Sequence, residues 1–151
     1  MTDLSFGVGT RIVTENAAKH NDAYIYYFAY PTHFYPVCAD HGSEVDFIFN
    51  KEDSTMNRTG DYKGMQNHMH EIWTSFAKTG VPTIDGVPCK KYNDADKPVI
   101  VFGKDGKVFQ EDKYLVKIDQ YTRALAKYES PAIVMNFAPP YEDYFTFGIL
   151  G

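Results

Sequence analysis

The spacing of apolar and polar residues predicts a helix, a buried strand and a loop in the N-terminal part of the chain. Residues 10–20 carry apolar side chains at helical intervals and are followed by Asn21-Asp22, which ends the helix. Residues 23–30 are apolar or aromatic on both faces, which is typical of a strand buried on both sides of a sheet. Pro31 closes that strand, and residues 31–40 are expected to form a loop.

The clearest helix signal covers residues 65–78. Its apolar side chains fall on a single stripe: Met65, Met69, Ile72, Trp73, Phe76 and Ala77. Lys78 suits the last turn, Gly80 can adopt the left-handed conformation of a helix C-cap, and Pro82 prevents the helix from continuing.

Beyond this helix the pattern changes. Residues 81–96 contain Pro, Gly and Asp without periodicity and are predicted to form a loop. Residues 98–110 are predicted to form a β-hairpin, because two runs of strand-forming residues flank a turn that contains Asp105-Gly106. A second helix is predicted over residues 119–129. The tail from Ala138 is aromatic but aperiodic, and we expect it to be poorly ordered or to lie on a partner.

Composition narrows the class of protein. At 151 residues the chain can bury one sizeable core, so a single domain over residues 1–151 is expected. Aromatic residues make up 16% of the chain, which indicates large buried or partner-facing surfaces. The net charge of -5, with no cluster of Lys and Arg, argues against nucleic acid binding. No apolar run approaches the roughly 18 residues of a membrane span.

The two cysteines, Cys38 and Cys89, predict neither a disulfide framework nor a zinc site, because they lie far apart and outside any Cys-x-x-Cys motif. The N-terminal Met1-Thr2-Asp3 lacks the apolar core of a signal peptide. A cytoplasmic protein with free thiols is therefore expected, unless a targeting segment has been lost with a missing upstream part.

His41 is the best candidate for a functional residue, because it follows the buried strand in the segment Asp40-His41-Gly42-Ser43-Glu44. A loop at the end of a rigidly held strand is a common place for catalytic side chains. As a general base in acyl transfer, His41 would accept a hydroxyl proton near neutral pH. Gly42 would let the backbone pass close to other loops, and Glu44 would anchor the loop. The alternative is a surface histidine satisfied by Asp40 or Glu44.

Other candidate chemistry is weaker. His68, His70 and Glu71 form a His-x-His-Glu run, but positions two apart on a helix point in different directions, so polar surface residues are favoured over a metal site. No serine stands in a Gly-x-Ser-x-Gly elbow. Cys38 precedes His41 by three residues, which leaves a thiolate–imidazole pair conceivable. Residues so close in a chain seldom reach the geometry of such a pair, and a small buried filler is favoured for Cys38.

Three stretches in register resemble a known family. Residues 22–28 are Asp-Ala-Tyr-Ile-Tyr-Tyr-Phe, residues 39–49 are Ala-Asp-His-Gly-Ser-Glu-Val-Asp-Phe-Ile-Phe, and residues 72–82 are Ile-Trp-Thr-Ser-Phe-Ala-Lys-Thr-Gly-Val-Pro. Together they resemble the C-terminal part of the type B carboxylesterases, the para-nitrobenzyl esterase and cholinesterase-like α/β-hydrolases. Tyr92 and residues 99–103 fit the family's final segment, although Cys89-Lys90 replaces its tryptophan-proline pair. The resemblance covers roughly residues 3 to 120.

The resemblance implies an α/β fold, namely the C-terminal portion of an α/β-hydrolase with a central-sheet strand, a histidine loop, a long amphipathic helix, a terminal β-hairpin and a C-terminal helix. It implies hydrolysis of a carboxylic ester by a Ser–acid–His triad whose histidine is His41. Glu44 and Gly42 would support that histidine, and a pocket would be lined or supported by Phe34, Tyr35 and Trp73. The resemblance implies no metal and no organic cofactor.

In the family, the serine elbow and the triad acid both lie upstream of the segment that this chain matches. We therefore expect the isolated chain to be inactive. Alone, the strand at residues 23–30 would expose two edges and two apolar faces. The expected partners are a missing N-terminal portion or further copies in a homo-oligomer, with a small-molecule ester as substrate of the intact enzyme. The alternative is a non-catalytic remnant of the fold that self-associates or binds a partner.

Overall fold

The computed structural model describes residues 6–31, 39, 41–49, 62–125 and 146–150. The helices and strands in this part of the chain are α1 (Val8–Ala17), β1 (Tyr24–Phe28), α2 (Glu44–Ile48), α3 (Tyr62–Thr79), β2 (Thr83–Ile84), β3 (Val87–Pro88), β4 (Val99–Phe102), β5 (Val108–Glu111), α4 (Val116–Leu125) and β6 (Thr146–Leu150). None of these helices combines the length and the apolar character needed to cross a membrane.

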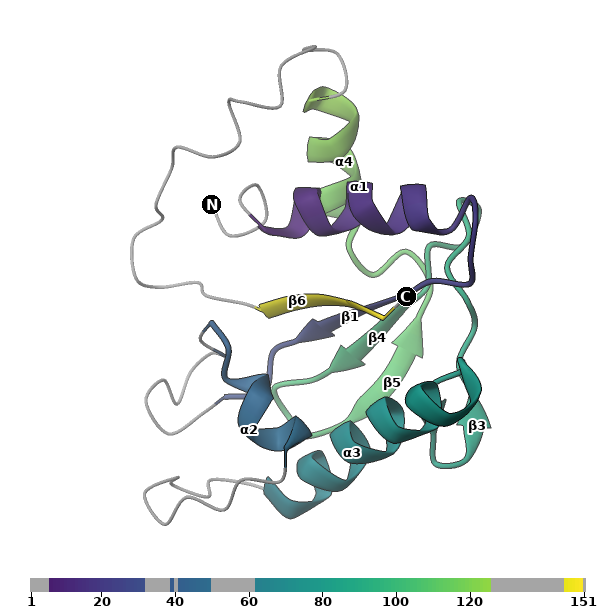
Figure 1. Ribbon diagram of the computed structural model, residues 1–151. Helices are drawn as coiled ribbons and strands as arrows, with labels where there is room; N and C mark the ends of the chain where they lie inside the picture. The colour runs from purple at the N-terminus through teal and green to yellow at the C-terminus, as the bar shows by residue number, and fades with distance from the viewer. Residues whose placement is uncertain (1–5, 32–38, 40, 50–61, 126–145, 151) are drawn as a thin grey trace.

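A mixed four-stranded sheet with the order β5-β4-β1-β6 forms the centre of the molecule (Figure 1). The predicted aromatic strand β1 pairs in parallel with β4, so that Tyr26 lies opposite Ile100. β4 and β5 form the predicted antiparallel hairpin. On its other edge, β1 pairs antiparallel with β6, and Tyr26 lies opposite Gly148.

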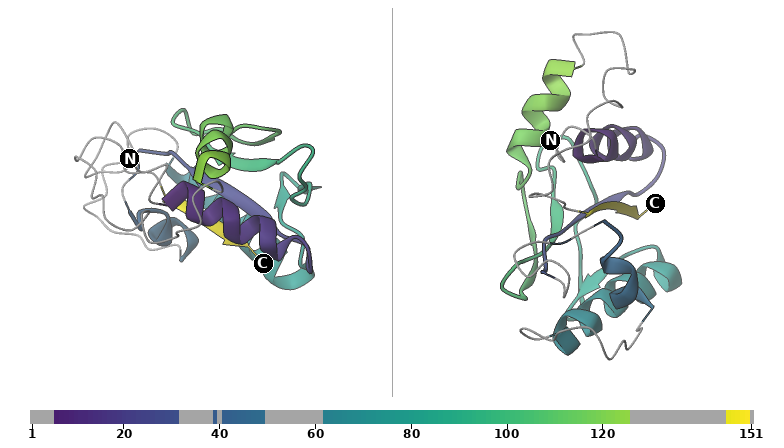
Figure 2. Two further views of the ribbon diagram at one scale, coloured as in Figure 1. Left: turned by 90° about the horizontal axis from the view of Figure 1, so that it is seen from above. Right: turned by 90° about the vertical axis from the view of Figure 1, so that its left-hand side faces the viewer.

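Helices cover both faces of this sheet, as the two views in Figure 2 show. On one face, the side chains of Tyr26, Phe28 and Phe102 pack in a core cluster with Met65 and Met69 of α3. The intervening strand residues point the other way, because successive side chains of a strand alternate between faces. They pack under α1 and α4, in a second cluster made by Val8, Ile25, Tyr92, Val99, Val101, Leu115 and Ile118. The prediction of a strand buried on both sides is confirmed.

Helix α3 confirms the strongest helix signal in the sequence. The apolar stripe faces the sheet, with Met65, Met69 and Ile72 fully buried. Gly80 has φ +76° and its N–H donates to the carbonyl of Phe76 at 2.7 Å, which satisfies an orphan carbonyl at the helix end. The helix begins at Tyr62, three residues earlier than predicted, and ends at Thr79, immediately before Gly80.

A buried ionic cluster joins α1 to α4 under the second face of the sheet. Arg11 is 0% exposed, and its Nε lies 3.2 Å from Oδ1 of Asp119. The guanidinium also lies over the ring of Tyr92, 5.2 Å from the centroid. The Lys97 ammonium is 3.5 Å from the same Asp119 oxygen. Nothing in the apolar pattern indicates that Arg11 is buried.

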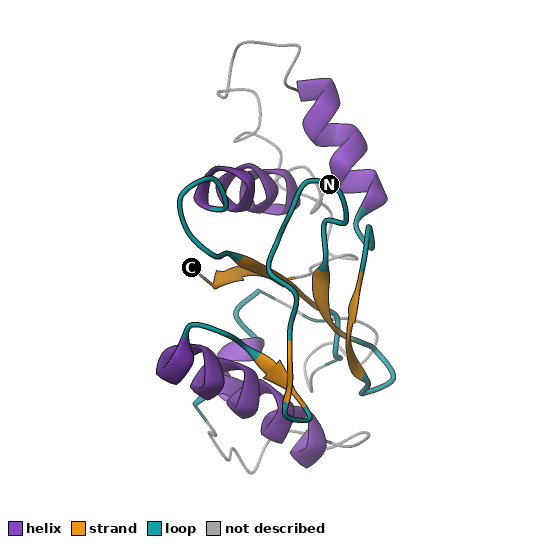
Figure 3. Ribbon diagram, turned by 90° about the vertical axis from the view of Figure 1, so that its right-hand side faces the viewer, coloured by secondary structure: helices purple, strands orange, loops and turns teal. Residues whose placement is uncertain are grey.

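Two secondary-structure predictions require correction. Residues 81–96 are predicted to be a loop, but β2 and β3 form a short hairpin within them, beside α3 (Figure 3). Its turn residues Asp85 and Gly86 have φ of +50° and +76°, the positive values that a two-residue hairpin turn requires. The C-terminal helix begins at Val116 rather than at residue 119, and residues after Leu125 lie outside the described part of the chain until β6.

The predictions for the tail and for the edges of β1 are also wrong for the described residues. The tail supplies the regular strand β6, whereas residues 138–145 lie outside the described residues. Because β6 pairs with one edge of β1 and β4 with the other, β1 exposes neither edge. Its two faces are covered by the core clusters. The chain therefore completes the surroundings of its aromatic strand from its own residues.

Candidate active site

The structure places His41 in an exposed turn immediately before α2. Its imidazole stacks on the ring of Phe6, with the centroids 5.7 Å apart and the planes inclined by 24°. Among the residues that the structure describes, no hydroxyl, thiol or carboxylate forms a hydrogen bond with this ring. Within the described residues, His41 is therefore an exposed residue that contacts Phe6 through its ring.

Gly42 turns the chain from His41 into α2. Its φ of +80° lies in the left-handed region that favours glycine, and its carbonyl accepts a hydrogen bond from the N–H of Val45 at 3.1 Å. A Cβ built at Gly42 would have no atom within 4 Å. Among the residues that the structure describes, no loop comes close to Gly42, and the glycine serves the backbone conformation of the turn.

Glu44 begins α2 and is buried, with 7% of its surface exposed. The hydroxyl of Tyr26, on the central strand, donates a hydrogen bond to Oε1 of Glu44 at 3.4 Å. Burial raises the pKa of Tyr26, and the charge and hydrogen bond of Glu44 raise it further, so the phenol stays protonated and remains a donor. This contact fastens α2, and with it the turn that carries His41, to the sheet.

Trp73, predicted to line or support a pocket, packs edge to face against Tyr26 with the ring centroids 6.2 Å apart. It is a partly buried member of the core between α3 and the sheet. Phe34 and Tyr35, the other predicted pocket residues, lie outside the described residues. Trp73 and Glu44 therefore both contact the side chain of Tyr26.

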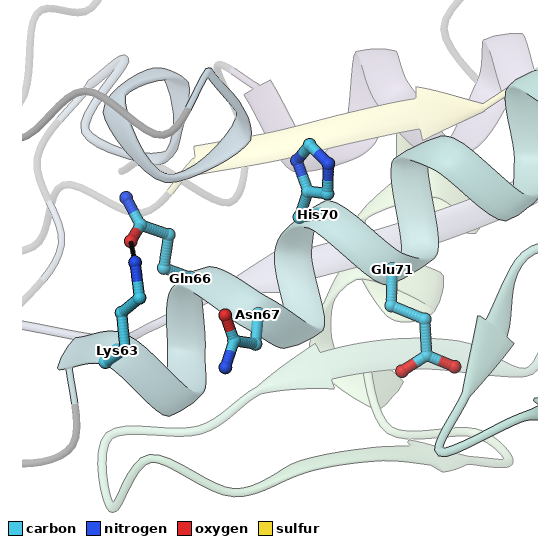
Figure 4. A pocket seen from close by; sticks show the side chains of 5 residues that line it. All are labelled: Lys63, Gln66, Asn67, His70 and Glu71. Atoms are coloured by element: carbon cyan, nitrogen blue, oxygen red, sulfur yellow. Dashed lines mark hydrogen bonds between the residues drawn. The ribbon is translucent and has the colours of Figure 1, made fainter.

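A pocket of about 280 Å³ lies along α3 and is lined by Lys63, Gln66, Asn67, His70 and Glu71 (Figure 4). The Lys63 ammonium donates to Oε1 of Gln66 at 3.0 Å, and Gln66 is buried although it is polar. Neither His41 nor Trp73 lines this pocket. The apolar pattern did not single out Gln66 as a pocket residue. Its position next to Met65, on the buried side of the helix, is the sequence feature that could have indicated it.

The described part of the chain does not supply His41 with a nucleophile. The hydroxyl of Ser75 donates to the carbonyl of Ile72 at 3.1 Å and accepts from the N–H of Thr83 at 2.9 Å, so it holds β2 against α3. Burial, with a smaller effect from the charge of Glu71, raises the pKa of the Cys89 thiol to about 11, which keeps it protonated near neutral pH. Cys38 lies outside the described residues.

The comparisons with known proteins agree with the motifs around His41. The model of the carboxylesterase family matches residues 1–123.

The chain belongs to the carboxylesterase family.

Among curated proteins, Esterase FE4 of Myzus persicae is 26% identical over 159 residues, which cover 93% of this chain and 25% of that protein. The chain thus spans about a quarter of the length of this curated relative. A solved structure of a PNB esterase is similar with a TM-score of 0.54 and 21% identity, covering 64% of this chain and 21% of the esterase chain. The fold is therefore a partial α/β-hydrolase fold.

Proposed function

We propose that this chain is the part of a carboxylic ester hydrolase that carries the histidine of its catalytic triad. One observation supports this role most directly: His41 is exposed on the turn before α2, and Glu44 of α2 accepts a hydrogen bond from Tyr26 of the central sheet. A general base must be held in place while its nitrogen remains open to the nucleophile, and an exposed residue on a turn next to the sheet suits this role.

In the proposed reaction, a serine hydroxyl attacks the carbonyl carbon of the ester while the imidazole of His41 takes the hydroxyl proton. The imidazolium then returns this proton to the leaving alcohol as the tetrahedral intermediate collapses. A water molecule, deprotonated by the same imidazole, releases the acid from the acyl-enzyme. An acidic side chain would hold the other ring nitrogen of His41 and stabilise its positive charge.

The serine and the acid must come from outside the described residues, because the described residues offer His41 neither. We propose that they belong to the remaining three quarters of a carboxylesterase, as the coverage of Esterase FE4 suggests. In that arrangement Glu44 and Gly42 position His41 and do not react. The substrate class is a small carboxylic ester.

Exposed apolar side chains near His41 offer a contact surface for the rest of the enzyme. Phe6 stacks on the imidazole, Val45 lies in the helix that follows it, and Phe49 is the residue after that helix. Phe49 is 76% exposed, which is costly for so large an apolar side chain. We propose that the remaining part of the hydrolase, or a second copy of this chain, covers this surface.

A non-catalytic role is the second candidate, and one observation favours it. Both edges of β1 are paired within the chain and both of its faces are covered, so the segment has the contacts of a unit that folds without the rest of the enzyme. In this case the fold would serve association with a partner and His41 would have no chemical role.

Hydrolysis of a short-chain para-nitrophenyl ester by the purified chain gives a first test. We expect no turnover above that of His41→Ala, because imidazole without a nucleophile contributes little. Circular dichroism of both proteins controls for folding. Rapid turnover that His41→Ala abolishes would contradict the incomplete site, because it would require a nucleophile within the chain or in a second copy.

A further inference from the structure

Three side chains with metal-binding atoms converge on the side of α3 that faces the β2–β3 hairpin. His68 and Glu71 are one helical turn apart on α3, and Asp85 occupies the hairpin turn. One donor atom from each residue lies within 4.8 Å of the other two. Nδ1 of His68 and Oδ1 of Asp85 are 3.8 Å apart. The sequence run of His68, His70 and Glu71 favoured polar surface residues over a metal site, whereas folding brings His68 and Glu71 together with Asp85.

The hairpin holds the Glu71 carboxylate through hydrogen bonds, but one carboxylate oxygen can still bind a metal ion. Its Oε1 accepts hydrogen bonds from the hydroxyl of Thr83 at 2.9 Å and the N–H of Gly86 at 2.8 Å. Its Oε2 accepts one, from the N–H of Asp85 at 3.2 Å. A carboxylate oxygen can accept two, so Oε2 retains a lone pair. The same hydrogen bonds orient the hairpin turn, and therefore Asp85, towards α3.

The contact between His68 and Asp85 is not needed to hold the hairpin. The three hydrogen bonds to Glu71 and the one from Thr83 to Ser75 already fix it to α3. At 3.8 Å the imidazole and the Asp85 carboxylate are too far apart for a hydrogen bond. Their separation is instead close to that of two ligands of one small cation.

We propose that His68, Glu71 and Asp85 form a binding site for a divalent transition metal of the zinc class. An imidazole with two carboxylates is a ligand set that zinc accepts, with a water molecule in the fourth position. The imidazole disfavours Mg²⁺ and Ca²⁺, which prefer oxygen ligands. Bond lengths near 2.0–2.1 Å place tetrahedral ligands about 3.3 Å apart. The Asp85 side chain, 76% exposed, is free to close the remaining gap.

The bound metal would join the hairpin to α3. It would take no part in ester hydrolysis. The hairpin lies beside the C-terminal end of α3, whereas α2, which follows His41, lies by its N-terminal end (Figure 1). The expected consequence of binding is a more stable α3–hairpin unit, because an ion that binds only the folded chain stabilises it.

Calorimetric titration of the purified chain, free of any histidine tag, with Zn²⁺ tests the proposal. The variants are His68→Gln and Asp85→Asn. Asparagine tolerates the positive φ of position 85, so the turn is preserved. His70→Gln is the matched control, because His70 lies on the same helix but lines the pocket of Figure 4 and is not one of the three ligands.

We expect the wild-type chain to bind one Zn²⁺, not to bind Mg²⁺ at the same concentration, and to melt at a higher temperature with Zn²⁺. Each ligand variant should weaken binding at least about tenfold, since even loss of a group that only orients a ligand costs this much. His70→Gln should bind as the wild type does. Absence of one-to-one binding, or equal weakening by His70→Gln and His68→Gln, would overturn the proposal.

Discussion

At the scale of single residues, Glu71 shows how one carboxylate can determine the position of a separate element. Its two oxygens accept hydrogen bonds from the side chain of Thr83 and the backbone of Asp85 and Gly86. Partial burial acts to raise the pKa of this carboxyl, but the hydrogen bonds from Gly86, Thr83 and Asp85, together with His68, lower it overall. The folded state therefore favours the ionised form.

The lowered pKa of Glu71 predicts an acid-dependent contribution to stability. The contribution is fully present above the unfolded pKa, near 4.5, and is lost as the pH falls through the lower pKa of the folded state. Glu71→Gln should reduce the free energy of unfolding by about 1 kcal/mol at pH 7 and by less in acid. Thermal unfolding in EDTA at several pH values measures this, with the exposed Glu111→Gln as control. A difference that does not change with pH would contradict the prediction.

Gly42 and His41 show what could be known of the site from residues alone. The motif around His41 indicated the histidine, and Gly42 beside it was expected to let the backbone pass close to other loops. The reason for the glycine required coordinates, because space around a Cβ and the sign of φ are properties of the folded chain. The stacking of Phe6 on His41 joins positions distant in sequence and leaves no periodic signal.

At the scale of elements, the buried pair Arg11–Asp119 ties α1 to α4. Taking a guanidinium out of water is costly, and the nearby carboxylate and the ring of Tyr92 compensate for it. Because Lys97 also lies near Asp119, removing Arg11 leaves that carboxylate with one cation.

Removing Arg11 alone should lower the free energy of unfolding more than replacing both Arg11 and Asp119 by apolar side chains. Arg11→Ala should destabilise the chain by about 3 kcal/mol, whereas Arg11→Met with Asp119→Leu should recover most of that loss. Denaturant unfolding measures both. Lys91→Ala, which breaks the exposed pair with Asp22, should have little effect. A double variant as unstable as Arg11→Ala would show that the ion pair itself is required.

Local patterns predicted some elements well and failed for others. The stripe along α3 and the Asp105-Gly106 turn between β4 and β5 are short-range signals, and both elements form as predicted. The turn Asp85-Gly86 carries the same signal, but the strands beside it have two residues each and give no alternation to detect. The pairing of β6 with β1 joins opposite ends of the chain, so no local window contains it.

At the scale of the whole molecule, the sheet is covered on both faces, yet apolar side chains remain exposed around His41. Phe6 stacks on His41, Val45 lies in α2 and Phe49 follows α2, and all three side chains are exposed. Exposed apolar side chains are a common feature of surfaces that bind another protein part, and we propose this role for these three.

Replacing Phe49 by Asp should therefore weaken any association of the chain, with itself or with the rest of a carboxylesterase. Light scattering over a range of concentrations measures the mass of the assembly. Val116→Asp is the control, because Val116 is also exposed but lies at the first position of α4. We expect an assembly larger than the monomer for the wild type and the control, and a smaller mass for Phe49→Asp. A monomeric wild-type chain at every concentration would contradict self-association.

The most direct test of the central claim restores the missing groups. The chain would be co-purified with the N-terminal three quarters of a carboxylesterase that carries its serine elbow and triad acid, and hydrolysis of a para-nitrophenyl ester would be measured for the complex. We predict activity that His41→Ala reduces by at least about 10³-fold and that the exposed His20→Ala leaves unchanged. Equal activity in the complexes of wild type and His41→Ala would show that His41 is not the catalytic histidine.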